Sequence, residues 1–160
     1  ELSEGNLIEM TPTGGKHGGI SFRLANLVGD HIEAHPLGYC TAAETGYILF
    51  TDETGKDTVR APDVGFVRAE RLPDGLPDGY IPVPPDFAIE VVSPSDRADE
   101  IQKKISEYLR YGTRLVLVVY PATQNVVAHT PSGAKTYAAG AAIDCSDGLP
   151  GFRLNIDDVF

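Results

Sequence analysis

The 160-residue sequence has few cysteines, no long apolar run and no excess of basic residues, and each lack excludes a class of protein. Its two cysteines, Cys40 and Cys145, are too few and too distant in sequence for the disulfide framework of a small secreted protein. No apolar stretch approaches the roughly 20 residues that a membrane-spanning helix needs. We therefore expect a cytoplasmic protein with free thiols and no membrane association.

The N-terminus lacks a secretory signal, because no basic region is followed there by an apolar segment. The sequence opens on Glu1 rather than Met, so we expect residues to be missing before it. Hydrophobic residues make up 42% and charged residues 22%, which is typical of a globular chain rather than a disordered one. With no internal repeat and no linker-like segment, this length predicts a single domain over residues 1–160.

Acidic residues outnumber basic ones by 23 to 13, which gives a net charge of −10. Proteins that bind nucleic acid normally rely on Lys and Arg contacts to phosphates, so the overall charge argues against long-range attraction to it. Several basic residues nevertheless lie close in sequence to two acids in predicted strands: Arg60, Arg68, Arg71, Arg97, Lys103, Lys104 and Arg110. The local field near those acids can therefore differ in sign from the net charge.

The spacing of apolar residues predicts two helices, one from about 19 to 35 and one from about 96 to 111. Strands are expected at 6–10, at 38–50 with a break near Glu44, around 59–68, at 87–92, at 114–120 and in a later hairpin around Pro131. Residues 69–86 are rich in proline and glycine and predict a long loop. This order of elements indicates an α+β or mixed-sheet fold.

Two of the predicted strands each carry one acid inside an apolar run. Asp63 lies in "VRAPDVGFVR" and Glu90 in "DFAIEVVSPSD". Because side chains alternate along a strand, each acid would share its face with mostly small residues, while the bulky residues on the opposite face form the core. A buried carboxylate is costly unless it is paired. Two carboxylates on adjacent strands, both facing a recess, predict a site for a hard divalent cation with oxygen ligands.

The predicted helix after Glu90 offers a cation to the same recess. Lys104 projects from the edge of the apolar stripe of this helix, whereas Lys103 is turned by about 100° toward solvent. A lysine beside two carboxylates and a metal can orient an attacking water or stabilise negative charge in a transition state. The pattern therefore favours Lys104 over Lys103 as a catalytic residue.

A purely structural role for the two acids stays open on spacing alone. Asp63 and Glu90 could pair with Arg60, Arg97 or Lys104 in an ion cluster that has no chemistry, since such networks imitate active sites.

The chain resembles the Uma-two family of restriction-endonuclease-like proteins, within the PD-(D/E)xK nuclease superfamily. The similar segments follow one another along nearly the whole chain: "EGNLIEM", "HGGISFRLANLV", "VRAPDVGFV", "AIEVVSPSDR", "KKISEYLRYGTRLVLVVYP" and "LPGFRL". The resemblance implies a restriction-endonuclease-like mixed β-sheet core flanked by helices. It also implies a site in which Asp63, Glu90 and the carbonyl of Val91 hold Mg²⁺ or Mn²⁺.

The sequence departs from the superfamily pattern at two places. Val92 stands where the motif lysine usually follows the acid, so the resemblance implies that Lys104 on the next helix supplies the cation. Tyr120 precedes Pro121 where an aspartate is expected, and the usual tryptophan in the strand before it is missing. The second departure concerns packing rather than the proposed site.

The function implied by the resemblance is a metal-dependent endonuclease that hydrolyses DNA phosphodiester bonds, with Lys104 assisting the attacking water. Glu9 and His17 match further family positions and are secondary candidates. A homodimer is a family-level expectation. The alternative is a nuclease-fold protein without turnover that acts as a binding or assembly module, and the acidic composition favours this alternative.

Overall fold

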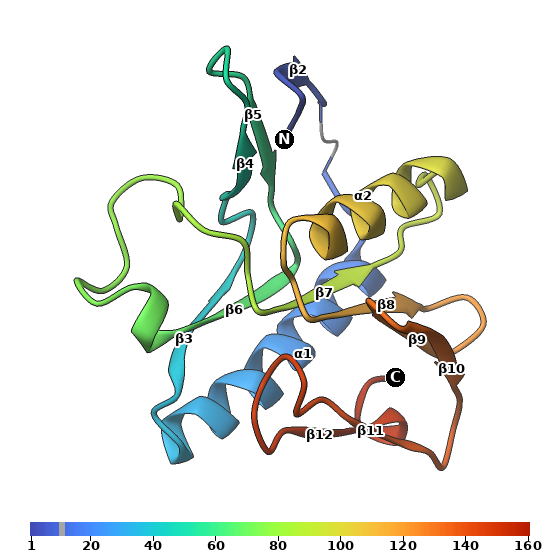
Figure 1. The fold of residues 1–160 in the computed structure, drawn as a ribbon. Helices are drawn as coiled ribbons and strands as arrows, with labels where there is room; N and C mark the ends of the chain where they lie inside the picture. The colour runs from blue at the N-terminus through green and yellow to red at the C-terminus, as the bar shows by residue number, and fades with distance from the viewer. Residues whose placement is uncertain (10–11) are drawn as a thin grey trace.

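The computed structural model describes residues 1–9 and 12–160, and its centre is a mixed sheet with the strand order β10-β9-β8-β7-β6-β3 (Figure 1). The two central strands, β7 (Phe87–Val91) and β8 (Leu115–Tyr120), run parallel and are connected through helix α2 (Ala98–Arg110). The remaining neighbours are antiparallel. The flanking strands are β3 (Gly38–Ala42), β6 (Val64–Arg68), β9 (Asn125–Thr130) and β10 (Gly133–Tyr137).

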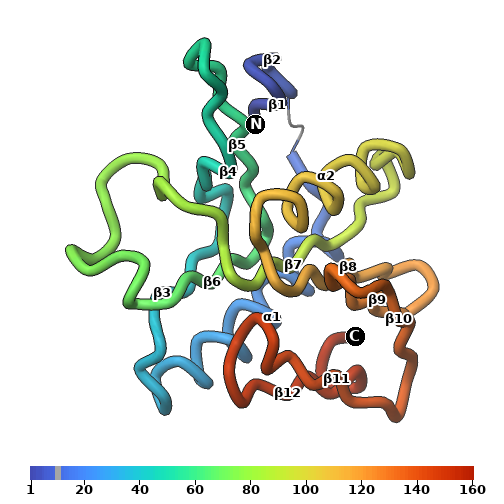
Figure 2. Tube along the Cα trace, in the orientation of Figure 1, coloured from blue at the N-terminus to red at the C-terminus, as the bar shows by residue number. Residues whose placement is uncertain are grey.

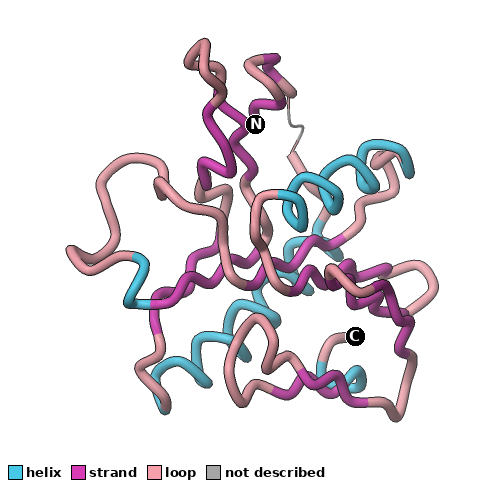
Figure 3. The backbone as a smooth tube through the Cα atoms, viewed as in Figure 1, coloured by secondary structure: helices cyan, strands magenta, loops and turns pink. Residues whose placement is uncertain are grey.

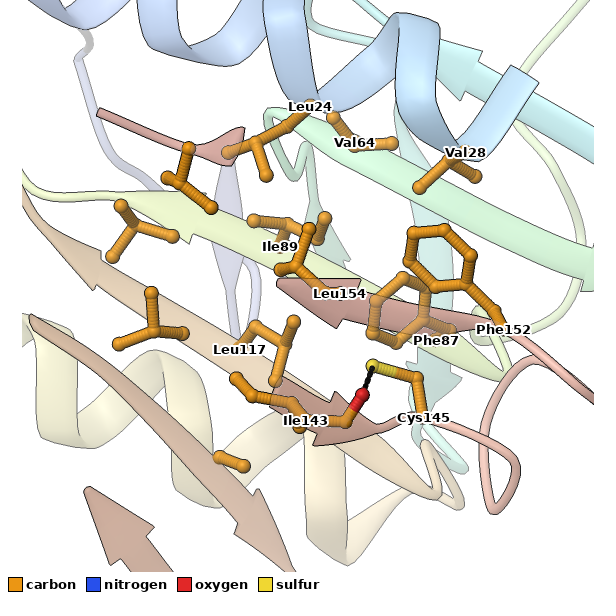
Figure 4. Packing of buried hydrophobic residues seen from close by; sticks show 14 of the residues in the cluster. Leu24, Val28, Val64, Phe87, Ile89, Leu117, Ile143, Cys145, Phe152 and Leu154 are labelled. Carbon is orange, nitrogen blue, oxygen red and sulfur yellow. Dashed lines mark hydrogen bonds between the residues drawn. The ribbon is translucent and has the colours of Figure 1, made fainter. Parts of the chain in front are cut away.

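Helix α1 (Gly15–Ala34) covers one face of this sheet and α2 covers the other (Figure 1). The alternating residues of β7 divide between the two faces. Phe87 and Ile89 lie in the core beneath Leu24 and Val28 of α1 (Figure 4). Ala88 packs on the opposite face, in a cluster that includes Ile105 and Tyr108 of α2. Because β8 is buried on both faces, its sequence is a nearly unbroken apolar run.

Smaller sheets lie on either side of this core. The first has the antiparallel order β2-β1-β5-β4 and contains β1 (Leu2–Ser3), β2 (Asn6–Leu7), β4 (Tyr47–Thr51) and β5 (Asp57–Arg60). It rises above the central sheet on the same side as α2 (Figure 2). The second pairs β11 (Ala142–Asp144) with β12 (Arg153–Asn155) and lies on the side of α1 (Figure 1). Chain segments from both ends of the sequence therefore meet at the central sheet.

The segment between β6 and β7 forms the predicted long loop. After the short 3₁₀ helix η1 (Ala69–Arg71), the chain projects to one side of the molecule with no further helix or strand up to Phe87, apart from an isolated bridge between Ile81 and Tyr47 (Figure 3). A second 3₁₀ helix, η2 (Ile156–Asp158), precedes the C-terminus. In the described ranges, no helix combines the length and the apolar character needed to cross a membrane.

Three predicted boundaries need correction. Asp63 lies in a bend directly before β6, so the prediction that it sits inside a strand is wrong, while Glu90 does lie within β7. The preceding Pro62 has no backbone N–H to donate to a ladder, which is consistent with β6 starting only after the bend. The first helix begins at Gly15 rather than near Gly19. The predicted strand at 6–10 is confirmed only for β2, and its last position lies outside the described residues.

Candidate active site

Asp63 lies where the chain passes from β5 into β6, beside the first turns of α1. One carboxylate oxygen, Oδ2, accepts a hydrogen bond from the backbone N–H of Val91 at 2.8 Å. The other oxygen, Oδ1, accepts from the hydroxyl of Ser21 at 3.1 Å and lies 3.4 Å from Nε2 of His17. The bend therefore carries Asp63 to the C-terminal end of β7 and ties it to α1.

Glu90 points from β7 toward α2 and is hydrogen-bonded through both carboxylate oxygens. Nζ of Lys104 donates to Oε2 at 3.1 Å, and the hydroxyl of Tyr108 donates to Oε1 at 2.8 Å. The Glu90 side chain is only 13% exposed. Residues i and i+4 lie on the same face of a helix, so α2 presents Lys104 and Tyr108 to Glu90 together. The predicted pairing of Glu90 with Lys104 is thus present in the structure.

Lys104 contacts a second buried carboxylate, that of Glu1. The distance from Nζ of Lys104 to Oε1 of Glu1 is 3.1 Å, and the Glu1 side chain is 1% exposed. The same carboxylate accepts hydrogen bonds from the N–H of Ala61 at 3.0 Å and from Nη1 of Arg60 at 2.8 Å. Arg60 in turn donates through Nε to Oε2 of Glu107 at 2.6 Å. Negative and positive side chains therefore alternate in the order Glu107, Arg60, Glu1, Lys104 and Glu90.

Burial and neighbouring charges shift the pKa values of these groups in different directions. Burial raises the pKa of Glu90 to about 7, and the negative charges of Glu1 and Asp63 add to the effect while Lys104 opposes it. Burial would lower the pKa of Lys104, but the carboxylates of Glu90 and Glu1 outweigh burial and raise it. Burial also disfavours the ionised form of Glu1, yet Lys104, Ala61 and Arg60 hold its pKa below the ordinary value. Lys104 is therefore a permanent cation near neutral pH, and Glu90 titrates there.

The raised pKa of Glu90 predicts that folding stability depends on pH. Between the ordinary value of 4.5 and about 7, the folded protein keeps a proton that the unfolded chain has lost. The stabilisation from this proton is complete below pH 4.5 and is lost as the pH rises through 7. We expect the unfolding free energy of wild type, relative to Glu90→Gln, to fall by about 2 kcal/mol from pH 5 to pH 8 without divalent cations. Urea titrations of both proteins measure this difference, and a pH-independent difference would contradict it.

The structure also places the remaining predicted site residues. Lys103 points outward as expected, and Glu107, at 3.9 Å, is its acidic partner among the described residues. His17 lies in the first turn of α1 beside Asp63, whereas Glu9 lies two residues after β2 with an exposed side chain. Arg97 pairs with an acid on α2 itself, Asp99. Of the acids and bases predicted from spacing, Glu90 and Lys104 are in direct contact and Asp63 adjoins them through the backbone of β7.

Unlike Lys104, three arginines that lie near the two acids in sequence are paired with other acids. Arg60 is buried between Glu1 and Glu107. Arg68 ends β6 and Arg71 ends η1, and they lie 3.7 Å and 3.0 Å from the buried carboxylate of Asp86. The expectation of a local positive field is therefore not met by these arginines.

Three residues at the site were not singled out from the sequence. Tyr108 follows Lys104 by four residues on α2, and this spacing is the available signal for a polar role beside Glu90. Ser21 similarly follows His17 by four residues on α1. Glu1 carries no such pattern, because its position depends on the pairing of β1 with β5, which joins residues almost 60 apart.

The residues present suit a cation that keeps most of its water ligands, such as Mg²⁺, better than a metal that needs three or four protein ligands. Among the described residues, no group of three or more His, Cys, Asp or Glu side chains is arranged to hold a metal ion. Mg²⁺ commonly binds through one or two carboxylates and keeps several water ligands. Asp63 and Glu90 offer such carboxylates, and a cation would favour the ionised form of Glu90 that burial disfavours. The carbonyl of Val91 belongs to the same strand end.

A mixed sheet with one helix on each face and an acid near the C-terminal end of a central strand is a restriction-endonuclease-like α+β fold. The chain belongs to the Uma2 family, described as "Putative restriction endonuclease", whose profile matches residues 1–157. This confirms the family predicted from the sequence and supports a nuclease.

A crystal structure described as "a putative nuclease belonging to DUF820", from Anabaena variabilis, is similar to this chain with a TM-score of 0.84 and 21% sequence identity. The match covers 99% of this chain and 88% of the other chain, which confirms the fold. No curated protein matches the chain.

Proposed function

We propose that the protein is a metal-dependent endonuclease that cleaves DNA at a site formed by Asp63, Glu90 and Lys104. The observation that carries the proposal is the ammonium of Lys104 held at 3.1 Å from Glu90, on the strand whose next N–H binds Asp63. Asp63 is held toward α1 and Glu90 toward α2, and both adjoin the C-terminal end of β7. Membership of a restriction-endonuclease family supplies the reaction class.

Each residue of the site has a role that follows from its surroundings. Asp63 and Glu90 would hold Mg²⁺ or Mn²⁺, with the Val91 carbonyl as a further oxygen ligand. Such a cation, when bound, activates a water and offsets the charge of the scissile phosphate. Because its pKa is raised, Lys104 acts as a hydrogen-bond donor that orients the water or stabilises phosphate charge, and does not act as a general base. His17 and Ser21 orient Asp63.

A nuclease-fold module that binds or assembles without turnover is the second candidate. It is favoured by the complete pairing of the site: Lys104 is shared between two carboxylates, and Glu90 has a donor at each oxygen. The net charge of −10 favours it as well. Under this alternative the ion pairs serve stability alone.

Metal binding and cleavage should depend together on Asp63. We expect calorimetry to show that Asp63→Asn binds Mg²⁺ at least about tenfold more weakly than wild type, because the variant loses one of the two anionic ligands. The same variant should no longer nick plasmid DNA in Mg²⁺ or Mn²⁺. Asp99→Asn is the matched control, since Asp99 is exposed and pairs with Arg97, the residue directly before α2.

The outcomes of this experiment separate the two candidates. Equal Mg²⁺ affinity in wild type and Asp63→Asn would remove the metal site from the proposal. Metal binding without cleavage of any DNA by wild type would instead favour the binding module.

The cytoplasmic setting and the homodimer remain predictions. The free thiols of Cys40 and Cys145 are compatible with a cytoplasmic setting.

A further inference from the structure

A polar pocket with an aromatic wall lies beyond the candidate active site, at the C-terminal end of α2. Its volume is about 380 Å³, within the range of pockets that hold small ligands. Three elements contribute to it: the turn between β1 and β2, the hairpin of β4 and β5, and the last turn of α2. The residues that line it are Glu4, Asn6, Phe50, Asp52, Lys56, Thr58, Arg110 and Tyr111.

Two parallel aromatic rings form one wall of this pocket. The centroids of Phe50 and Tyr111 are 4.9 Å apart, and their planes differ by 6°. The guanidinium of Arg110 lies 5.4 Å from the centre of the Tyr111 ring. The register of β4 shifts between Ile48 and Phe50, so Leu49 enters the core while Phe50 is 45% exposed at the pocket. Bulges of this kind commonly redirect a side chain toward a site.

The chemistry of the walls fits a flat, uncharged aromatic ligand with a polar edge. The stacked pair offers a π-face of the kind on which nucleobases stack in proteins that bind single strands. Lys56 and Arg110 are offset by Glu4 and Asp52, so the pocket has no excess charge that would attract a bare phosphate. Asn6 provides an amide, a group that can hydrogen-bond base edges. A nucleobase meets all of these conditions.

The pocket and the candidate active site lie along the same helix, α2. Lys104 and Tyr111 are seven residues apart, which is two helical turns and about 10 Å. Consecutive nucleotides of one strand of a duplex advance by about 3.4 Å, so this separation corresponds to a few nucleotides. A base inside a duplex has both faces covered by its neighbours and can reach the stacked rings only when it is unpaired. The geometry therefore favours a single strand over an intact duplex.

We propose that Phe50 and Tyr111 bind an unpaired nucleobase a few nucleotides away from the phosphate at Lys104, so that the substrate is single-stranded or locally unpaired DNA. This inference rests on the proposed nuclease function, because the same strand must reach both sites. On this proposal, Phe50 contributes to the preference for single-stranded over double-stranded DNA.

The test is a binding measurement that requires no cleavage. Asp63→Asn protein, in low salt with EDTA, is titrated into a single-stranded oligonucleotide that contains 2-aminopurine, whose fluorescence is quenched by stacking. We expect quenching on binding, and an affinity about tenfold lower when Phe50→Ala is added. Phe50→Tyr should restore binding. Phe22→Ala is the matched control, because Phe22 is 69% exposed on α1, away from the pocket lining.

Every outcome bears on the proposal. Equal affinity in the Phe50→Ala and Phe22→Ala backgrounds would overturn it, as would tighter binding of the matching duplex or no binding of the single strand. Cleavage of double-stranded plasmid by wild type, together with any of these results, would leave the nuclease function standing. Stacking that depends on Phe50 without cleavage of any DNA would instead reject the nuclease and retain the pocket.

Discussion

Lys104→Ala should lower the rate of DNA cleavage by about 10²-fold or more, while Lys103→Ala should leave it nearly unchanged. The two lysines are adjacent in sequence, carry the same charge and belong to one helix. Comparing the two variants therefore separates the effect of the position of the lysine from the effect of losing a positive charge. Lys104 contacts Glu90 and Glu1 at 3.1 Å each. Lys103 is half exposed and lies 3.9 Å from Glu107. Only the first can donate a hydrogen bond to a water or phosphate at the end of β7.

Mg²⁺ affinity distinguishes a catalytic Lys104 from one that merely stabilises the site. Removal of the ammonium takes away a cation that competes for the Glu90 carboxylate, so Lys104→Ala should bind Mg²⁺ at least as tightly as wild type while it fails to cleave. Single-turnover cleavage of labelled DNA at saturating Mg²⁺ measures the rate, and calorimetry measures the affinity. Full activity in Lys104→Ala would exclude the lysine from the reaction, and equal losses in both lysine variants would indicate a general effect of charge.

The fold could be predicted from the sequence largely because its central strands are distinctive over short distances. The apolar run of β8 and the alternation in β7 identify buried strands without any knowledge of their partners. The stripe of α2 likewise indicated which of two adjacent lysines turns inward. In each case the sequence pattern and the structural feature that it predicts lie within one helix or strand, so no knowledge of long-range contacts was needed.

The errors and omissions concern features that depend on contacts between elements. Asp63 was expected inside a strand, but the chain bends there to pass between two sheets, and its partners come from α1 and β7. Helix α1 starts before its apolar stripe, across glycines that intrinsic propensity disfavours, so that tertiary context overrides propensity. Glu1 reaches Lys104 only through the pairing of β1 with β5. Spacing along one chain cannot predict such long-range contacts.

Ion pairs with buried acids keep several arginines from contributing to the surface charge. Arg60, Arg68 and Arg71 all contact buried carboxylates, so they contribute little positive field to the surface. A substrate with a high density of phosphates would therefore gain little from long-range attraction. Stacking at Phe50 would supply affinity that does not depend on net charge, which connects the acidic composition to the proposed preference for unpaired strands.

Arg60→Leu should lower the unfolding free energy by about 3–5 kcal/mol at neutral pH. Arg60 is 2% exposed, with Glu107 bound through Nε at 2.6 Å and Glu1 through Nη1 at 2.8 Å. Replacing the guanidinium by an apolar side chain removes the nearest cation of Glu107 and one of the two cations beside Glu1, both in a poorly solvated place. The expected loss is a large fraction of the 5–15 kcal/mol that stabilises a typical domain. Urea unfolding of wild type and variant measures it.

Arg97→Leu is the matched control, because it removes an exposed arginine–aspartate pair at the start of α2. Such surface pairs contribute little to stability, so this variant should unfold at nearly the same urea concentration as wild type. Similar losses in the two variants would mean that the buried position of Arg60 has no special importance.

The pH dependence of the Arg60→Leu effect separates lost charge pairing from lost packing. In wild type, Arg60 and Lys104 help to keep the pKa of Glu1 below its ordinary value. Without Arg60, protonation of Glu1 becomes easier and removes the uncompensated charge, so the stability gap to wild type should narrow as the pH falls from 7 to 5. A packing defect would give the same gap at both values. Because Glu1 also holds Lys104, a gap that narrows with acid would show that Arg60 supports the candidate site through charge.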